Sequence, residues 1–275
     1  MQKGAISVLE YGISFIGAGN MANAIINSLL AENRFSPDKI SVSDPSDSKK
    51  DKFNKMGINV VSSNVELAKK NDILILAVKP QVIDSVLNEI AGEVNSVCVV
   101  SIAAGVSTPK IRSILGEDTP VIRVLPNTPM LVSEGMTVVA EAPDVDCEIF
   151  KYVLNIFKLS GEVLVLPEDK MNEAIPLSSS SPAFFFRFLN AMAHAGEKLG
   201  IDYNEALRLS AVAMYGSAKY AMSTDKSLSE LIKLVSSPGG TTIAALSAFD
   251  EFNFEAFIDD VAVRCVNRAY ELGKD

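Results

Sequence analysis

Apolar and polar positions divide the chain into two parts with different periods. From Ile13 to about Leu166, short apolar runs alternate with segments whose apolar residues recur every three or four positions. After Pro167 the strand pattern disappears and the helical period continues. The expected strands cover residues 13–16, 40–43, 59–61, 73–78, 97–102, 121–125, 136–140 and 162–166. We therefore predict an α/β domain at 12–167 and an all-helical domain at 168–275.

Alternating strands and helices predict a mostly parallel sheet covered by helices on both faces. Residues 74–78 and 97–100 are continuously apolar, as central parallel strands are. The last one or two strands are expected to run in the opposite direction. Any ligand is expected at the carboxyl ends of the strands.

The second part predicts long helices with wide apolar stripes. Residues 182–199, 203–222 and 252–272 have the helical period, and Ser181 is a suitable N-cap with Pro182 at the first helical position. About 108 residues without a sheet can hardly bury stripes such as Phe184–Phe186. Pairing with the same domain of a second copy would bury them, so we expect a homodimer.

The first strand leads through a glycine turn into a helix, and this is the most informative stretch of the chain. Residues 13–16 are followed by Gly17-Ala18-Gly19-Asn20-Met21-Ala22, which opens an amphipathic helix. In a dinucleotide-binding (Rossmann) fold, Gly17 would permit the turn and Gly19 would let a diphosphate approach the backbone. The helix N-terminus would then attract the negative charge. A structural strand–turn–helix is the alternative.

The second strand ends in Asp44, where such folds contact the adenosine ribose. A carboxylate there accepts hydrogen bonds from ribose hydroxyls and repels a 2′-phosphate, which favours NAD over NADP. Because Pro45-Ser46 follows, Asp44 could instead cap the next helix. Lys49 and Lys50 could neutralise a phosphate or simply form an exposed helix face.

Three further strand ends carry small or rigid residues. They are Ala77–Pro80, Ser101–Val106 and Arg123–Pro129. The first of them, taken alone, is a strand end followed by a proline-started helix. Together they indicate that one edge of the sheet is a site.

One loop of the helical part, Ser236–Thr242, combines hydroxyls and glycines just before a predicted helix. Such a loop exposes backbone amides that suit a carboxylate, or it is a helix-capping turn.

Composition narrows the chemistry. The 275 residues are 48% apolar and 21% charged, with a net charge of −9 and no basic cluster, which argues against nucleic acid or acidic membrane as partner. No apolar segment is long enough to cross a bilayer and the start lacks a signal-peptide layout, so a cytoplasmic location is expected.

The three cysteines lack metal-type spacing and are expected to be reduced and in the core; no metal site is predicted. His194 is the single histidine, so no serine-based triad is expected and the chemistry would come from a cofactor, as in hydride transfer.

Six motifs, in their order and separations, resemble pyrroline-5-carboxylate reductase. They are Phe15–Ala22, Ala77–Pro80, Ser101–Val106, Pro126–Pro129, Ser180–Ala183 and Ser237–Thr242. The resemblance covers residues 12–272. It implies NADH- or NADPH-dependent reduction of 1-pyrroline-5-carboxylate to L-proline, the last step of proline biosynthesis, by a homodimer that is often assembled into a ring of dimers.

The resemblance also implies roles for individual residues. The dinucleotide would be lined by Ile16, Gly17, Ala18, Gly19, Asn20, Met21, Asp44, Asn64, Ala77, Val78, Lys79, Pro80, Ile102, Ala103 and Ala104. The substrate carboxylate would be held by Ser236, Ser237, Gly239, Gly240, Thr241 and Thr242, with Thr242 as the catalytic contact to the ring nitrogen. Asp225 would stand in for an acidic residue near the substrate.

The chain departs from the family pattern in its helical half, at Ser179, Asn190, His194, Val212, Ser227–Ser229 and Lys233. Three alternatives therefore remain open. They are a reductase of another imine, a β-hydroxyacid dehydrogenase with Lys198 in the catalytic position, and a dinucleotide-binding dimer without catalysis. The last of these would bind cofactor without turnover.

Overall fold

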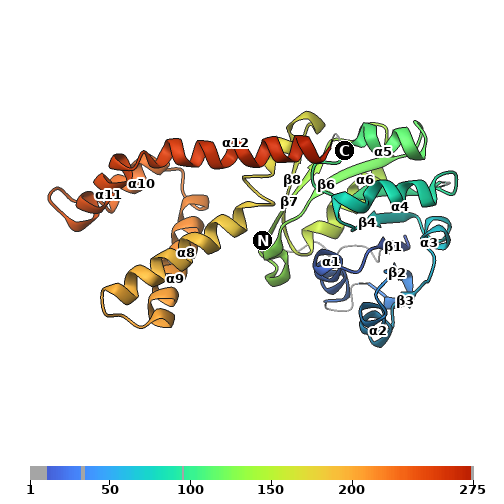
Figure 1. Ribbon diagram of the computed structural model, residues 1–275, viewed down its shortest axis with the longest axis horizontal. Coiled ribbons are helices and arrows are strands. Elements are labelled where there is room, and N and C mark those ends of the chain that lie inside the picture. The colour runs from blue at the N-terminus through green and yellow to red at the C-terminus, as the bar shows by residue number, and fades with distance from the viewer. Residues whose placement is uncertain (1–10, 32–34, 95, 274–275) are drawn as a thin grey trace. The chain divides into compact units, whose positions relative to one another are not determined.

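The computed structural model describes residues 11–31, 35–94 and 96–273 and forms two compact units (Figure 1). The sheet unit extends to Ser180 and takes in the chain again from Arg264; the helical unit is Ser181–Val263. The predicted boundary at 167 coincides with the end of the sheet, whereas the compact units divide later. The start of the chain, where no signal-peptide layout is expected, lies outside the described residues.

The sheet unit contains one eight-stranded sheet. Its strands are β1 (Ile13–Ile16), β2 (Ile40–Ser43), β3 (Asn59–Val60), β4 (Ile73–Leu76), β5 (Cys98–Ser101), β6 (Val121–Leu125), β7 (Gly135–Ala140) and β8 (Gly161–Leu166). Their order is β3-β2-β1-β4-β5-β6-β7-β8. Strands β1 to β6 are parallel, β7 is antiparallel to β6, and β8 is parallel to β7. All eight predicted strands are present, although β4 and β5 end at Leu76 and Ser101, earlier than expected. The expected reversal of the last one or two strands is confirmed for both.

Helices cover both faces of this sheet because successive strand residues point to opposite sides. On β1, Phe15 joins a core with Ile25 and Phe157 on one face. Its neighbour Ile16 joins a second core with Leu87 on the other. The helices of this unit are α1 (Asn20–Leu30), α2 (Asp47–Lys55), α3 (Asn64–Lys70), α4 (Pro80–Ile90), α5 (Thr108–Leu115), α6 (Cys147–Lys158) and α7 (Met171–Ala174), with 3-10 turns η2 (Pro37–Lys39), η3 (Thr128–Val132) and η4 (Glu168–Lys170).

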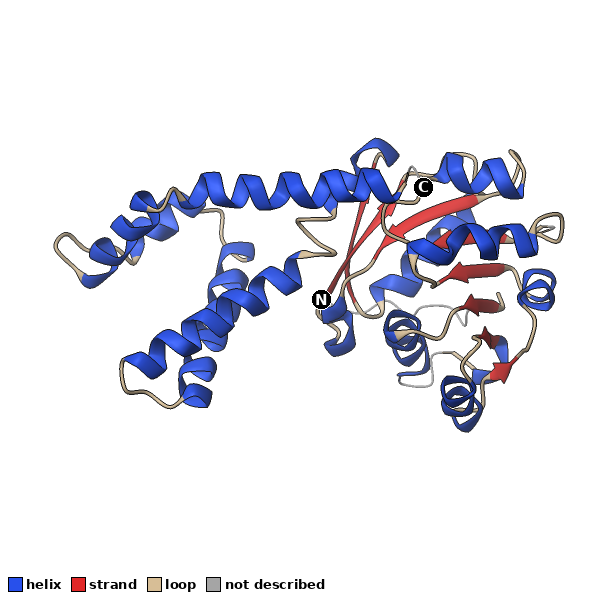
Figure 2. Cartoon of the chain, in the orientation of Figure 1, coloured by secondary structure: helices blue, strands red, loops and turns tan. Residues whose placement is uncertain are grey.

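The helical unit has no strand among its residues, as Figure 2 shows. It contains α8 (Ser181–Lys198), α9 (Tyr203–Met222), α10 (Leu228–Leu234), α11 (Thr241–Glu251) and the first part of α12 (Phe254–Leu272). A side chain at Gly196 would collide with Ala206, so α8 and α9 pack closely. Many large apolar side chains nevertheless stay exposed, including Phe186 at 63% and Met222 at 84%. The single chain thus leaves apolar stripes uncovered.

The three cysteines lie in different environments. Cys98 is buried in β5, and burial raises the pKa of its thiol to about 12. Cys265 is half-buried, but Cys147 is exposed because it begins α6 at the surface. The expectation of three core cysteines is therefore wrong for Cys147.

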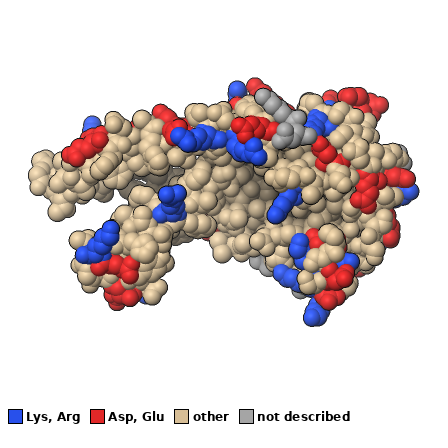
Figure 3. Space-filling model, viewed as in Figure 1, with Lys and Arg blue, Asp and Glu red and all other residues tan. Residues whose placement is uncertain are grey.

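Charged side chains do not form a basic patch on the face seen in Figure 3, where Lys and Arg are interspersed with Asp and Glu. Within the described part of the chain, every helix is too short or too polar to span a bilayer.

Candidate functional site

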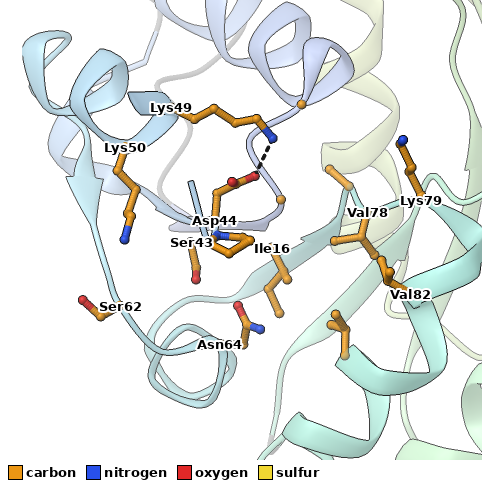
Figure 4. A pocket seen from close by; sticks show the side chains of 15 residues that line it. Ile16, Ser43, Asp44, Lys49, Lys50, Ser62, Asn64, Val78, Lys79 and Val82 are labelled. Carbon is orange, nitrogen blue, oxygen red and sulfur yellow. Dashed lines mark hydrogen bonds and ion pairs between the residues drawn. The ribbon is translucent and has the colours of Figure 1, made fainter. Parts of the chain in front are cut away.

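A cleft of about 520 Å³ lies where the strand order reverses between β1 and β4 (Figure 4). This position at the carboxyl ends of parallel strands is where open α/β sheets bind ligands, and the volume is typical of a small-molecule site. The cleft is lined by Ile16, Gly17, Gly19, Ser43, Asp44, Pro45, Lys49, Lys50, Ser62, Asn64, Ala77, Val78, Lys79, Val82 and Val86.

The two glycines of the turn have different physical roles. Gly17 has a φ of 100°, and a Cβ there would lie 2.6 Å from the Ala77 carbonyl oxygen. Its N–H donates to the Ser43 carbonyl at 2.8 Å, which ties the ends of β1 and β2 together. Gly19 has an ordinary φ of −75°, and a Cβ there would meet no atom within 4 Å. Gly17 is therefore required by the fold, whereas Gly19 leaves space beside the cleft.

The start of α1 is suited to an anion. Gly19 is its N-cap, and no side chain caps it in the described structure. The first N–H groups of a helix lack partners within the helix, and the helix dipole favours negative charge there. Because Gly19 adds no side chain, a diphosphate can approach these amides closely, so the residues present fit a dinucleotide.

The Asp44 carboxylate accepts three hydrogen bonds from neighbouring groups of the protein. Its Oδ2 accepts hydrogen bonds from the Ala18 N–H at 2.8 Å and from Lys49 Nζ at 3.1 Å, and its Oδ1 accepts from the Ser46 N–H at 2.9 Å. Burial acts to raise the pKa of the carboxyl, but these donors outweigh it and hold the pKa below its usual value. The N-cap of α2 is Ser46, so Asp44 does not cap that helix. Its carboxylate holds the glycine turn instead.

Positive charge is available on the same side of the cleft. Lys49 is paired with Asp44, and Lys50 pairs with the exposed Asp47 at 2.8 Å. Figure 4 places the Lys50 amine between Asp44 and Ser62 at the cleft. Asn64, which also lines the cleft, donates a hydrogen bond to Glu89 Oε2 at 2.7 Å. Lys50 can therefore contact an anionic ligand while Lys49 neutralises the carboxylate.

The sequence indicated about two thirds of this lining, counting Lys49 and Lys50. Of the residues expected at the dinucleotide, Ile16, Gly17, Gly19, Asp44, Asn64, Ala77, Val78 and Lys79 line the cleft. Ala18, Asn20, Met21 and Pro80 lie beside them in the chain, outside the lining. Five further lining residues were not predicted; they are Ser43, Pro45, Ser62, Val82 and Val86. Ser62 follows β3, whose carboxyl end faces the same edge of the sheet, so its position after a predicted strand could have indicated it. Val82 and Val86 lie one turn apart on α4, and their helical spacing could have indicated them.

The expected contacts Ile102, Ala103 and Ala104 follow β5 and lie outside the cleft lining. The Ile102 N–H donates to the Leu76 carbonyl, which places this loop beside the end of β4. Ala103 is buried, and Ile102 and Ala104 are partly exposed. The loop thus extends the same sheet edge.

The residues expected at the substrate all belong to the helical unit. Gly240 is the N-cap of α11, without a side-chain cap in the described structure, and its N–H donates to the Ser237 carbonyl. Gly239 has a φ of 74°. The Ser236 hydroxyl oxygen is buried without a hydrogen-bond partner in the described structure. Ser236–Thr242 thus forms a turn that leads into the uncapped start of α11, whereas Asp225 lies between α9 and α10.

Several departures from the family pattern have local structural partners. Ser227 and Glu230 form a capping box at the start of α10. His194 is exposed on α8 and pairs with Glu197 Oε2 at 2.7 Å. Asn190 accepts a hydrogen bond from the Tyr203 hydroxyl at 2.9 Å. These side chains therefore stabilise helix ends and the α8–α9 pair.

Two family descriptions match the chain. Residues 168–272 match the family described as pyrroline-5-carboxylate reductase dimerisation, and residues 12–105 match the one described as NADP oxidoreductase, coenzyme F420-dependent. The chain is 40% identical to the pyrroline-5-carboxylate reductase of Escherichia coli K12, over 97% of this chain and all of that protein. It is 38% identical to the enzyme of that name from Methanosarcina acetivorans, over 95% of this chain and 98% of that one.

Solved structures agree. Pyrroline carboxylate reductase of Plasmodium falciparum with NADP bound superposes with a TM-score of 0.88 at 27% identity, covering 96% of this chain and 98% of that one. Pyrroline-5-carboxylate reductase from Coxiella burnetii gives a TM-score of 0.86 at 34% identity, covering 97% and 100%. With this identity over nearly the full length and with the same fold, the chain belongs to the pyrroline-5-carboxylate reductase family.

Proposed function

We propose that this protein reduces 1-pyrroline-5-carboxylate to L-proline with NADPH or NADH. The observation that carries the proposal is the uncapped start of α1 at the cleft between β1 and β4, next to a glycine that leaves room for a diphosphate. Family membership supplies the substrate. The bound nicotinamide cofactor supplies the hydride that reduces the C=N bond.

The cofactor end of the reaction depends on residues of the cleft. The amides at the start of α1 bind the diphosphate, and Gly19 keeps the approach open. Lys50 offers a positive charge on the adenosine side. Asp44 is already engaged by Ala18, Ser46 and Lys49, so its charge is partly neutralised. The sequence-based preference for NAD therefore stays a prediction, and Lys50 offers a positive charge to a 2′-phosphate on this side of the cleft.

The substrate end is assigned to the turn before α11. Its amides at Thr241 and Thr242 bind the substrate carboxylate, which the helix dipole favours. The Thr242 hydroxyl accepts a hydrogen bond from the protonated ring nitrogen. A protonated cyclic imine is already electrophilic, so the protein has to orient it and exclude water more than it has to supply an acid. Asp225 is a secondary contact in this assignment.

A homodimer is part of the proposal. The family match over residues 168–272 carries the description dimerisation, and the helical unit exposes Phe186, Met222 and Phe252. Burying such residues against a second copy is the usual solution for a large apolar surface. We extend the proposal to a ring of dimers as the higher assembly. Hydride transfer requires the substrate to lie against the nicotinamide, and we propose that this contact forms in the assembled enzyme.

The test is NADPH and NADH oxidation, followed by absorbance, with 1-pyrroline-5-carboxylate as substrate and proline identified as product. We expect turnover with both cofactors at measurable rates. Tight NADPH binding without reduction of the imine would reject the proposal in favour of a dinucleotide-binding dimer. Turnover only with other imines would assign a different substrate.

A further inference from the structure

The loop after β5, residues 102–107, is fixed by the carboxyl end of α12. Gly105 is buried with a φ of 80°, and a Cβ there would lie 2.5 Å from the Ala269 carbonyl oxygen. A side chain at Gly273 would likewise collide with the Gly105 carbonyl. The two backbones are therefore in direct contact, and neither tolerates a larger residue without moving. Both segments belong to the sheet unit.

The far end of the same loop is held by Glu168 from η4. Its Oε1 accepts from the Thr108 N–H and its Oε2 from the Thr108 hydroxyl, each at 3.1 Å. Thr108 is the first residue of α5, so this carboxylate binds the start of that helix. Glu168 therefore holds the end of the loop together with Ser107, the N-cap of α5.

Glu168 is held in turn by a buried cation. Arg123 on β6 is 2% exposed and donates to Glu168 Oε1 at 3.3 Å and to Asn172 Oδ1 at 2.6 Å. A buried guanidinium needs a paired carboxylate, because an uncompensated buried charge is strongly destabilising. The start of α5, η4 and α7 are thus linked through one ion pair.

The end of α12 is bound to the same group of residues. The Tyr270 hydroxyl donates to Glu173 Oε1 at 2.7 Å, which joins α12 to α7. Ala269 is buried with Leu125 and Met171, and Ala104 packs against this cluster. The end of α12 therefore contacts the loop at Gly105, and η4 binds Thr108 at its other end. Helix α7 connects the two through Glu173 and Asn172.

We propose that Glu168 and the end of α12 are positioning elements for the nicotinamide end of the cofactor. The proposal rests on the proposed function. In the proposed function the adenosine lies beside Asp44, which follows β2, and Lys50 on α2. An extended dinucleotide then reaches past β4 toward the loop after β5. Hydride transfer depends on the ring being held within a fraction of an ångström, and a loop fixed at both ends meets that need. Because α12 begins in the helical unit, the unit proposed to form the dimer is covalently continuous with this positioning element.

The experiment compares ligands that contain or lack the nicotinamide. Dissociation constants for NADPH, NADH and ADP-ribose with and without a 2′-phosphate are measured for the full chain and for Glu168→Ala. Glu148→Ala removes a surface glutamate paired with Lys151 and is the matched control. We expect Glu168→Ala to weaken NADPH binding about tenfold, a change of about 1.4 kcal/mol, while ADP-ribose binding stays within about twofold. The primary isotope effect with 4-deuterated NADPH should also rise.

If Glu168 has only a structural role, Glu168→Ala should weaken the binding of the nicotinamide ligands and of ADP-ribose together, or change neither. Either result would overturn the proposal. Thr108→Val removes only the hydroxyl contact to Glu168, and Gly105→Ala disturbs the loop from the α12 side. These two variants replace Glu168→Ala in the same binding measurements if Glu168→Ala does not fold. We expect the same selective loss in each. If the unaltered protein binds none of these ligands, the proposed function fails instead, which is a distinguishable result.

Discussion

The substitution Gly19→Ala distinguishes a role of this glycine in folding from a role in cofactor binding. Gly19 has a φ of −75°, and a Cβ there meets no atom within 4 Å. Alanine is a poorer N-cap than glycine, while it reduces the entropy of the unfolded chain. These effects oppose each other, so we expect the free energy of unfolding to change by less than about 1 kcal/mol.

Cofactor binding should respond much more strongly. The added methyl group occupies the space through which a diphosphate would reach the amides of α1. A hydrogen bond to a charged group contributes about 1.5–3 kcal/mol, so losing one corresponds to a roughly 10- to 150-fold rise in the dissociation constant for NADPH.

Thermal unfolding and NADPH fluorescence titration measure the two quantities on the same samples. Gly92→Ala is the matched control, because Gly92 has a φ of 78° with open space around it and lies outside the cleft. Its substitution should cost about 1–2 kcal/mol of stability through backbone strain and leave NADPH binding unchanged. If Gly19→Ala binds NADPH as tightly as the unaltered protein, no diphosphate lies against this turn and our reasoning is refuted.

Three further predictions address other parts of the proposal. Thr242→Ala should lower kcat roughly 10- to 100-fold in steady-state assays with little change in NADPH affinity, and a loss confined to cofactor binding would contradict its role. The pKa of Asp44 is lowered, so its carboxylate adds stability above about pH 4 that is lost as the pH falls below that value. Asp44→Asn should therefore reduce the free energy of unfolding by about 1–3 kcal/mol at pH 7 and much less at pH 3 in urea titrations; an equal loss at both pH values would be inconsistent. Phe186→Asp should convert the dimer to monomer in sedimentation experiments because it places a charge in an apolar contact, whereas an unchanged dimer would show that this part of α8 faces elsewhere.

The sequence predicted the local structure well because each local signal had one dominant physical cause. The continuous apolar run at β4 specifies a strand buried on both faces, and the period of α1 specifies one buried face. Gly17 was predicted at a turn that only glycine fits, and its φ of 100° confirms this. The uncovered apolar residues of α8 were also foreseen, because a helical segment of that length has too little chain to cover them.

The tertiary structure decided which groups face one another. Asp44 has the same place in the sequence whether it caps α2 or holds Ala18, and only the approach of β2 to the glycine turn selects Ala18, while the ribose contact stays a prediction. Arg123, Glu168 and Thr108 are far apart in the chain and carry no common pattern, yet the order of β5 and β6 and the return of the chain through η4 bring them into one partly buried network. Periodicity determines which side of an element is buried, because it depends on near neighbours in the chain. Partners of a charged or polar side chain depend on how distant elements pack, and that information is absent from any single stretch of sequence.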